Sequence, residues 1–187
     1  MRPPRERPSR ARADPEAFAS RALDFRVLVA DSSSLIVLAE IGLLASALAR
    51  WRLSTAASVI AELRTGRKVP GGRLNDEGLF GAIRIIDGPE EKGADGKPLS
   101  TDAALLSLAL RAGLPLLSED GRMLRAAEEG NMDCLDSLVA LELLQATGAI
   151  SREQADACLL RLRSRSIVSP ARAAWAGEVG QAAAKFG

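Results

Sequence analysis

The feature that most constrains the fold is an alternation of short, uniformly apolar runs with longer segments of helical character. Residues 27–30 are continuously apolar and rich in valine, which is the pattern of a strand buried on both faces of a parallel sheet. Residues 114–117 form a second run of this kind. Helix-capping residues follow such runs. The alternation predicts a three-layer α/β/α domain with a mostly parallel central sheet and C-terminal helices.

Local signals place the other elements. We expect strands near residues 51–53 and 82–86, and helices over residues 35–49, 54–63, 100–111, 121–129, 135–146, 151–163 and from 170 onward. Ser54 or Thr55 is the expected N-cap of the second helix, and Ser151 opens a capping-box pattern. Residues 65–79 and 88–98 are rich in glycine, proline and charged residues, so we interpret them as loops.

The chain divides into three parts by composition. Residues 1–12 hold five arginines and three prolines and almost nothing apolar, so we expect residues 1–24 to form a mostly disordered basic arm. A weak, sequence-independent contact with nucleic acid is an alternative role for that arm. Residues 25–146 hold the predicted α/β domain. Residues 147–187 are expected to be a helical extension packed on the same domain.

The composition excludes several kinds of catalytic and metal-binding site. The chain has no histidine, which excludes catalytic triads with a histidine base and histidine-ligated zinc. Its two cysteines, Cys134 and Cys158, are too few and too far apart for a zinc cluster and are expected to be free thiols in a reducing compartment. No apolar run approaches the length that crosses a bilayer. We therefore expect a cytoplasmic protein without a membrane partner.

Carboxylates are the remaining candidates for chemistry. Asp31 follows the first apolar run and Asp120 comes just after the second. If these strands are neighbours, both side chains lie at the carboxyl edge of the sheet, where ligands bind in open α/β folds. Asp102 shares a helix face with apolar residues, which predicts that it lies at the edge of the core. Glu62 stands among apolar residues of another predicted helix.

Four carboxylates at one edge repel one another unless a cation balances them. Oxygen-only ligands favour Mg²⁺ or Mn²⁺, and such a cation assists phosphodiester hydrolysis by lowering the pKa of bound water. Each acid also has a simpler interpretation. Asp31, Asp102 and Asp120 suit helix N-termini, and Glu62 could pair with an arginine on its own helix.

Four segments, in this order, resemble the motifs of PIN domains, the fold of many metal-dependent ribonucleases of prokaryotes. These segments are the strand that leads into Asp31-Ser32-Ser33-Ser34, the strand and helix that carry Glu62, the pair Thr101-Asp102, and Ser118-Glu119-Asp120. The resemblance covers about residues 26–146. Residues 166–169 are similar to the tail of a solo-PIN branch of toxins and ribonucleases.

The resemblance implies a site and an activity. Asp31, Glu62, Asp102 and Asp120 match the family's catalytic, metal-binding acids, and Ser32 and Ser118 match supporting hydroxyls. The implied protein is an Mg²⁺- or Mn²⁺-dependent endoribonuclease, with the toxin of a toxin–antitoxin pair as the finer expectation. Its implied partners are an RNA substrate, an antitoxin protein and a second copy of the chain. The alternative is a non-catalytic PIN-like module that binds protein or RNA, which the modest net charge of +1 favours slightly.

Overall fold

The computed structural model describes residues 14–64, 79–86, 98–165 and 168–186. Its strands are β1 (Val27–Ala30), β2 (Arg52–Ala56), β3 (Arg84–Ile86), β4 (Leu116–Leu117) and β5 (Cys134–Leu135). Its helices are α1 (Pro15–Leu23), α2 (Ser32–Ile41), α3 (Leu44–Arg50), α4 (Ala57–Arg64), the 3₁₀ turn Leu79–Ala82, α6 (Thr101–Ala112), α7 (Gly121–Glu129), α8 (Ser137–Ala146), α9 (Arg152–Ser164) and α10 (Pro170–Phe186).

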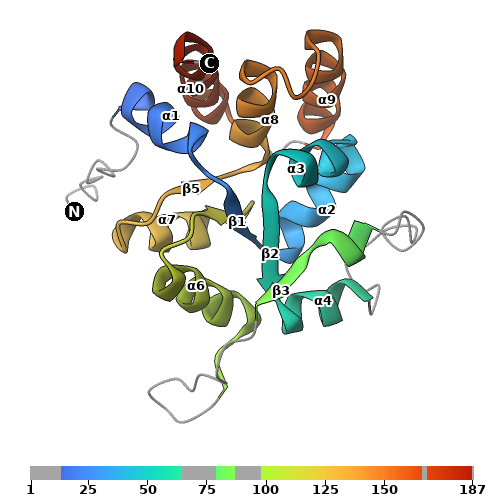
Figure 1. Cartoon of the computed structure of the whole chain (residues 1–187), viewed down its shortest axis with the longest axis vertical. Coiled ribbons are helices and arrows are strands. Elements are labelled where there is room, and N and C mark those ends of the chain that lie inside the picture. The colour runs from blue at the N-terminus through green and yellow to red at the C-terminus, as the bar shows by residue number, and fades with distance from the viewer. Residues whose placement is uncertain (1–13, 65–78, 87–97, 166–167, 187) are drawn as a thin grey trace, which may run out of the picture.

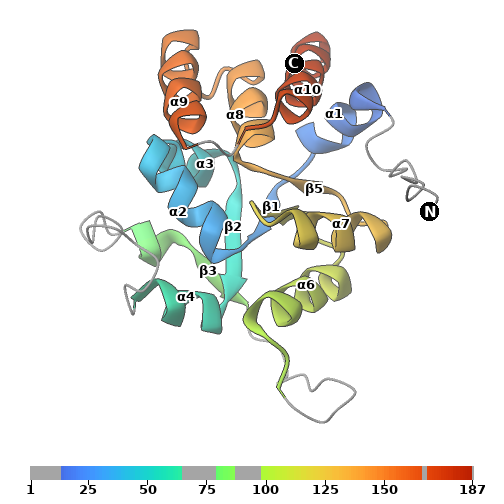
Figure 2. The same ribbon diagram turned by 180° about the vertical axis from the view of Figure 1, so that it is seen from behind.

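The five strands form one parallel sheet in the order β3-β2-β1-β4-β5. Helices α6 and α7 lie on one side of it, and α2, α3, α8, α9 and α10 lie on the other (Figures 1 and 2). Covering both faces explains why Leu28, Val29 and Ala30 are all completely buried in the central strand. The predicted three-layer α/β/α class is therefore confirmed.

The pairing of β1 with β4 brings two distant segments together. Val29 lies beside Leu116 and Ala30 beside Leu117. Because the strands are parallel, the residues that follow them meet at the same edge of the sheet. Asp31 and Ser118 are those residues. The strand adjacency on which the predicted site depends is thus present.

The N-terminal prediction is wrong for part of residues 1–24. Asp14 accepts hydrogen bonds from the N–H groups of Glu16 and Ala17, and Pro15 starts helix α1. Phe18 is buried on this helix and its ring lies 5.2 Å from that of Trp175 on α10. The buried residues of α1, Phe18, Ala19 and Ala22, share one face of the helix, and α1 packs against α10. Composition averaged over residues 1–24 does not reveal this face. Residues 1–13 lie outside the described residues.

Two local predictions also differ from the structure. The helix expected over residues 35–49 is two helices, because Gly42 takes a left-handed conformation with φ of 83° and ends α2. Ser54 and Thr55 lie within β2 rather than at a helix N-cap. Thr55 instead donates its hydroxyl to the carbonyl of Ala30 at 2.6 Å, which ties β2 to β1.

The C-terminal helices begin where their capping and proline signals indicate. Ser151 and Gln154 form the predicted capping box of α9, and Pro170 is the first residue of α10. Helix α10 packs along α8 and α1 (Figure 1). The predicted loops 65–79 and 88–98 fall almost entirely outside the described residues.

No single helix in the described ranges has the length and apolar character needed to cross a bilayer. Helices α2 and α3 reach that length only as a pair, and they are bent by 114° where they meet.

Candidate functional site

The centre of the site is the carboxylate of Asp31, which is only 4% exposed at the carboxyl end of β1. It accepts hydrogen bonds from the N–H of Ser34 at 2.7 Å, from the hydroxyl of Ser33 at 2.9 Å and from the hydroxyl of Ser118 at 2.5 Å. The first of these bonds caps helix α2. The last one crosses from β1 to the end of β4. Asp31 is therefore both the N-cap of α2 and the meeting point of two strand ends.

Two further serine contacts fix this corner. The completely buried hydroxyl of Ser118 accepts the N–H of Asp120 at 3.1 Å while it donates to Asp31. Ser34 donates its hydroxyl towards the carbonyls of Asp31 and Leu117, at 3.1 and 3.0 Å. The backbone after β1 and the backbone after β4 are thus joined by side chains as well as by the sheet.

Glu62 reaches the same corner from helix α4. The hydroxyl of Ser32 donates to its Oε2 at 3.2 Å, and the side chain is half-buried. Val59, Ile60 and Leu63 are the buried residues of α4, and they fix the face of the helix that turns inward. The predicted supporting role of Ser32 towards an acid is consistent with this contact.

Asp120 is placed as a helix cap. Its carboxylate accepts the N–H of Arg122 at 2.7 Å and lies 3.4 Å from the Nη2 of the same residue. The N–H of Arg122 is the main reason that the pKa of Asp120 is lowered from its usual value. Ser118 connects Asp120 to Asp31, since its hydroxyl accepts the N–H of Asp120 and donates to the carboxylate of Asp31.

Asp102 differs from the prediction. It lies in the first turn of α6, two residues after the cap Ser100, and it is exposed rather than set at the core edge. Its position at the very start of the helix explains this, because the apolar face it shares becomes buried only from Leu105 onward. Helix α6 begins beside the end of β2, which it contacts (Figures 1 and 2).

The donor chemistry of these acids fits an oxygen-seeking cation such as Mg²⁺ or Mn²⁺. Their arrangement is looser than a ready-made metal cluster. Within the described residues, no three Asp, Glu, Cys or His side chains lie together closely enough to hold a metal ion. In the described part of the chain, Ser118 bonds to Asp31 and to the N–H of Asp120, and Ser32, the residue after Asp31, bonds to Glu62. Asp102 takes part in none of these bonds. Metal binding stays a prediction.

The charge of Asp31 has an unusual environment. Among the residues that the structure describes, its hydrogen-bond partners are hydroxyls and an N–H, and no lysine or arginine forms an ion pair with it. A buried carboxylate normally has a cationic partner, because hydrogen bonds alone rarely replace all of its hydration. Asp31 is therefore a buried carboxylate at the sheet edge that no lysine or arginine of the described ranges pairs with.

A second group of buried acids lies next to this corner. The side chain of Glu119 is 8% exposed and turns away from Asp31, so that its Oε1 accepts the N–H of Ser137 at 2.7 Å. Arg172 of α10 donates its Nε and Nη2 to Asp136 Oδ2 at 2.9 and 2.5 Å, and its Nη2 lies 3.5 Å from Glu119 Oε2. Here buried carboxylates share one guanidinium.

Burial, and after it the negative charge of Asp136, raises the pKa of Glu119 to about 7. The N–H of Ser137 and the charge of Arg172 lower the pKa of Glu119 but do not offset burial. Asp136 is also the N-cap of α8, where it accepts the N–H of Val139 at 2.9 Å.

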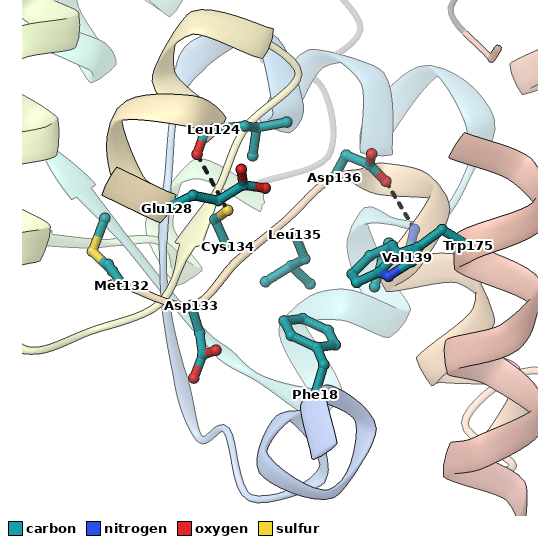
Figure 3. Close-up of a pocket in the computed structure, with 10 residues that line it drawn as sticks. All are labelled: Phe18, Leu124, Glu128, Met132, Asp133, Cys134, Leu135, Asp136, Val139 and Trp175. Atoms are coloured by element: carbon teal, nitrogen blue, oxygen red, sulfur yellow. Dashed lines mark hydrogen bonds between the residues drawn. The ribbon is translucent and has the colours of Figure 1, made fainter. Parts of the chain in front are cut away.

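A small pocket near this cluster does not suit a substrate. It lies between α1, α7, β5, α8 and α10, with the rings of Phe18 and Trp175 on one side and Asp133 and Cys134 on another (Figure 3). Its free volume of about 20 Å³ accommodates about one water molecule. Asp133 is held by Arg21. We interpret the pocket as a packing gap between elements.

Sequence reasoning missed Ser33, Asp136 and Arg172. Asp136 had a usable signal, because it follows an apolar residue and precedes an apolar helix, as Asp31 does. The strand before it has only two residues, Cys134–Leu135, which is too short to recognise. Arg172 had no signal, because its partners lie 36 or more positions away in the chain.

No family model, no curated protein and no solved structure matches this chain. The resemblance to PIN domains therefore depends on the four motifs alone.

Proposed function

We propose that this chain is a metal-dependent endoribonuclease that hydrolyses RNA phosphodiester bonds with Mg²⁺ or Mn²⁺ as cofactor. The observation that carries the proposal is the buried carboxylate of Asp31 at the joined ends of β1 and β4, where hydroxyls and an N–H surround it and no described protein cation pairs with it. In open α/β sheets, ligands bind beyond the carboxyl ends of the strands, which is the edge where Asp31 lies. The motif resemblance supplies the class of reaction.

The residues of the site have distinct roles in this proposal. Asp31, Glu62, Asp102 and Asp120 would hold the cation, whose chemistry is to lower the pKa of bound water and to neutralise charge on the phosphate. Ser118 and Ser33 orient Asp31, and Ser32 orients Glu62. Arg122 beside Asp120 is exposed and would contact a backbone phosphate.

The finer part of the proposal concerns partners and location. A toxin of this class would work in the cytoplasm, cut cellular RNA and be blocked by an antitoxin protein that covers the acidic edge. A homodimer is the third expected assembly. These statements follow from the resemblance and await direct tests.

A nuclease assay tests the proposal. The full chain is incubated with mixed RNA in Mn²⁺, in Mg²⁺ and in EDTA, and product ends are determined. Cleavage that requires the metal and leaves 5′-phosphate and 3′-hydroxyl ends is expected. Asp31→Asn should lower the rate on the order of a hundredfold, while the exposed-site control Ser164→Ala should cut at the wild-type rate. Equal cutting by Asp31→Asn would remove the proposal.

A second function is favoured by a specific observation. Asp31 and Asp120 both serve as helix N-caps, and Asp102 is exposed in a first helical turn, so that helix capping alone accounts for three of the four acids. That pattern suits a non-catalytic PIN-like module that binds protein or RNA. Such a module would bind RNA equally well in Mn²⁺ and in EDTA, and it would cut in neither.

A further inference from the structure

Arg172 is the cationic centre of the buried cluster beside the site. It comes from the first turn of α10, its side chain is 22% exposed, and its guanidinium contacts acids from two other parts of the chain. Nε and Nη2 both donate to Asp136 Oδ2, and Nη2 also faces Glu119 Oε2. Within the described residues Glu119 Oε2 is buried and has no hydrogen bond. The positive charge of Arg172, 3.5 Å away, therefore partly compensates for the lost hydration of this oxygen.

Glu119 connects this cluster to the candidate site through the backbone. It stands between Ser118, which donates to Asp31, and Asp120, whose N–H is bonded to Ser118. Its own side chain extends the other way and accepts the N–H of Ser137 at the start of α8. The segment 118–120 is thus held on one side by Asp31 and on the other by α8 and α10.

We propose that Arg172 is a positioning residue for the segment 118–120: through Glu119 it sets where Ser118 and Asp120 lie relative to Asp31. The consequence for catalysis rests on the proposed nuclease function, whereas the positioning itself does not. The C-terminal helix therefore belongs to the site's support, although it comes from the part of the chain that lies beyond the resemblance to the family's catalytic motifs.

Docking of α10 does not by itself require Arg172. Ala176, Val179, Ala182 and Ala183 bury the helix against its neighbours. Lys185 also pairs with Glu16 of α1 at 2.6 Å. The helix thus has apolar and ionic contacts further along its length. Arg172 is a described contact of α10 that reaches the segment 118–120.

The guanidinium shape suits this task. A planar fork can place one nitrogen between two carboxylates while another nitrogen holds the first carboxylate in place. In this geometry Asp136 orients the guanidinium and Glu119 receives its second contact. Because Asp136 is itself held in place as the N-cap of α8, it fixes the orientation of the Arg172 guanidinium.

Hydrogen exchange of backbone amides tests the positioning, because local opening and global unfolding affect different amides. Two variants weaken the link: Glu119→Gln, which keeps size and leaves the Arg172–Asp136 pair, and Arg172→Met, which removes the guanidinium. Arg21→Met is the matched control, since Arg21 also makes a forked ion pair with an aspartate, Asp133, but one that does not reach the segment.

At about pH 8, where Glu119 with its pKa of about 7 is mostly ionised, we expect the amides of Asp120, Arg122 and Ser137 to exchange at least about tenfold faster in both variants, a factor of ten being 1.4 kcal/mol of local opening. The amide of Val29, bonded to Pro115 within the sheet, should exchange at the wild-type rate in Glu119→Gln. Arg21→Met should leave the three amides unchanged. Unchanged exchange in Glu119→Gln, or an equal acceleration at Val29, would overturn the proposal.

Kinetics supply a second readout. With RNA and Mn²⁺, Glu119→Gln should lower kcat about tenfold or more and leave KM within about twofold, because positioning acts on the site and not on RNA contacts. A rise of KM alone would overturn the catalytic part of the proposal. If the wild-type chain cuts no RNA, the proposed function fails, and the exchange experiment still decides the positioning role.

Discussion

The carboxyl edge of this sheet carries a pair of buried acids, Glu119 and Asp136, and one further buried acid, Asp31, and the pair and the single acid are stabilised differently. Glu119 and Asp136 share the guanidinium of Arg172, which is the usual way for a protein to bury negative charge. Asp31 is equally buried, but its partners are Ser33, Ser34 and Ser118. Glu119 and Asp136 thus have a protein cation beside them, whereas Asp31 has none among the residues that the structure describes.

The difference separates support from function. A carboxylate that is paired with a protein cation helps to hold helices in place. Glu119 and Asp136 do this through Arg172, which connects α10 to α8 and to the segment 118–120. A carboxylate surrounded only by neutral donors keeps its orientation and its charge, which are the two properties that a cation ligand needs. This comparison is the reason that we assign the chemistry to Asp31 and the positioning to Arg172.

The largest expected effect is the loss of the guanidinium. Arg172→Met leaves two buried carboxylates without their cation, and we expect the free energy of unfolding to fall by about 3–5 kcal/mol. The control Arg21→Met removes an ion pair whose arginine is 51% exposed and should cost less than about 1 kcal/mol. Urea unfolding of both variants measures the difference. Equal losses would mean that the two ion pairs are energetically alike and that the cluster is not special.

Stability should also depend on pH through Glu119. Its pKa is about 7 in the folded protein and 4.5 in the unfolded chain. The folded state therefore binds the proton more tightly. Its contribution is fully present below pH 4.5 and decreases as the pH rises to 7, by about 1.4 kcal/mol per pH unit and up to about 3 kcal/mol in all.

Glu119→Gln cannot ionise, so urea unfolding between pH 4.5 and 7.5 should show a flatter profile for this variant than for the wild type. Burial also raises the pKa of Glu142, and that residue keeps part of the slope in both proteins. Identical slopes would show that Glu119 ionises normally and that the buried cluster is more open than the structure indicates.

A smaller effect is expected at the hydroxyl that joins the strand ends. Ser118→Ala removes the donor to Asp31 and the acceptor for the N–H of Asp120, which should lower the free energy of unfolding by about 1–3 kcal/mol. Ser164→Ala, at an exposed hydroxyl bonded to the carbonyl of Arg161, should change it by less than about 0.5 kcal/mol. If Ser118→Ala is as mild as its control, the hydrogen bond to Asp31 is not made in solution.

The smallest effect on stability belongs to Asp102. Because the residue is exposed in the first turn of α6, Asp102→Asn should change the free energy of unfolding by no more than about 0.5 kcal/mol. The same variant should cut RNA far more slowly if Asp102 holds the cation. Full activity in Asp102→Asn would remove this residue from the site and leave Asp31, Glu62 and Asp120 as the candidates.

The sequence predicted the parts of the fold that have strong local signals. The apolar run of β1 and the capping box at Ser151 each predicted an element that the structure contains. Strand β5 was missed because its two residues carry no period. Helix α1 was missed because its apolar face is meaningful only when α10 lies against it.

The site was predictable in part for the same reason. Parallel strands with apolar runs bring their ends together, which predicted that Asp31 would meet the segment after β4. The exposure of Asp102 was not predictable, because a face shared with apolar residues does not tell where along a helix burial begins. The contacts of Arg172 with Glu119 and Asp136 depend on the tertiary packing of α10. No short-range sequence pattern indicates them.

The most direct test of the central claim is thermal and urea unfolding of the full chain during titration with Mn²⁺. A cation that binds the folded protein stabilises it by about 2.7 kcal/mol at one hundred times its Kd. The account predicts that the wild type gains stability with Mn²⁺ in this way and that Asp31→Asn gains much less. A wild type that does not respond, or an Asp31→Asn variant that responds equally, would contradict the claim that the buried charge of Asp31 is there to receive a cation.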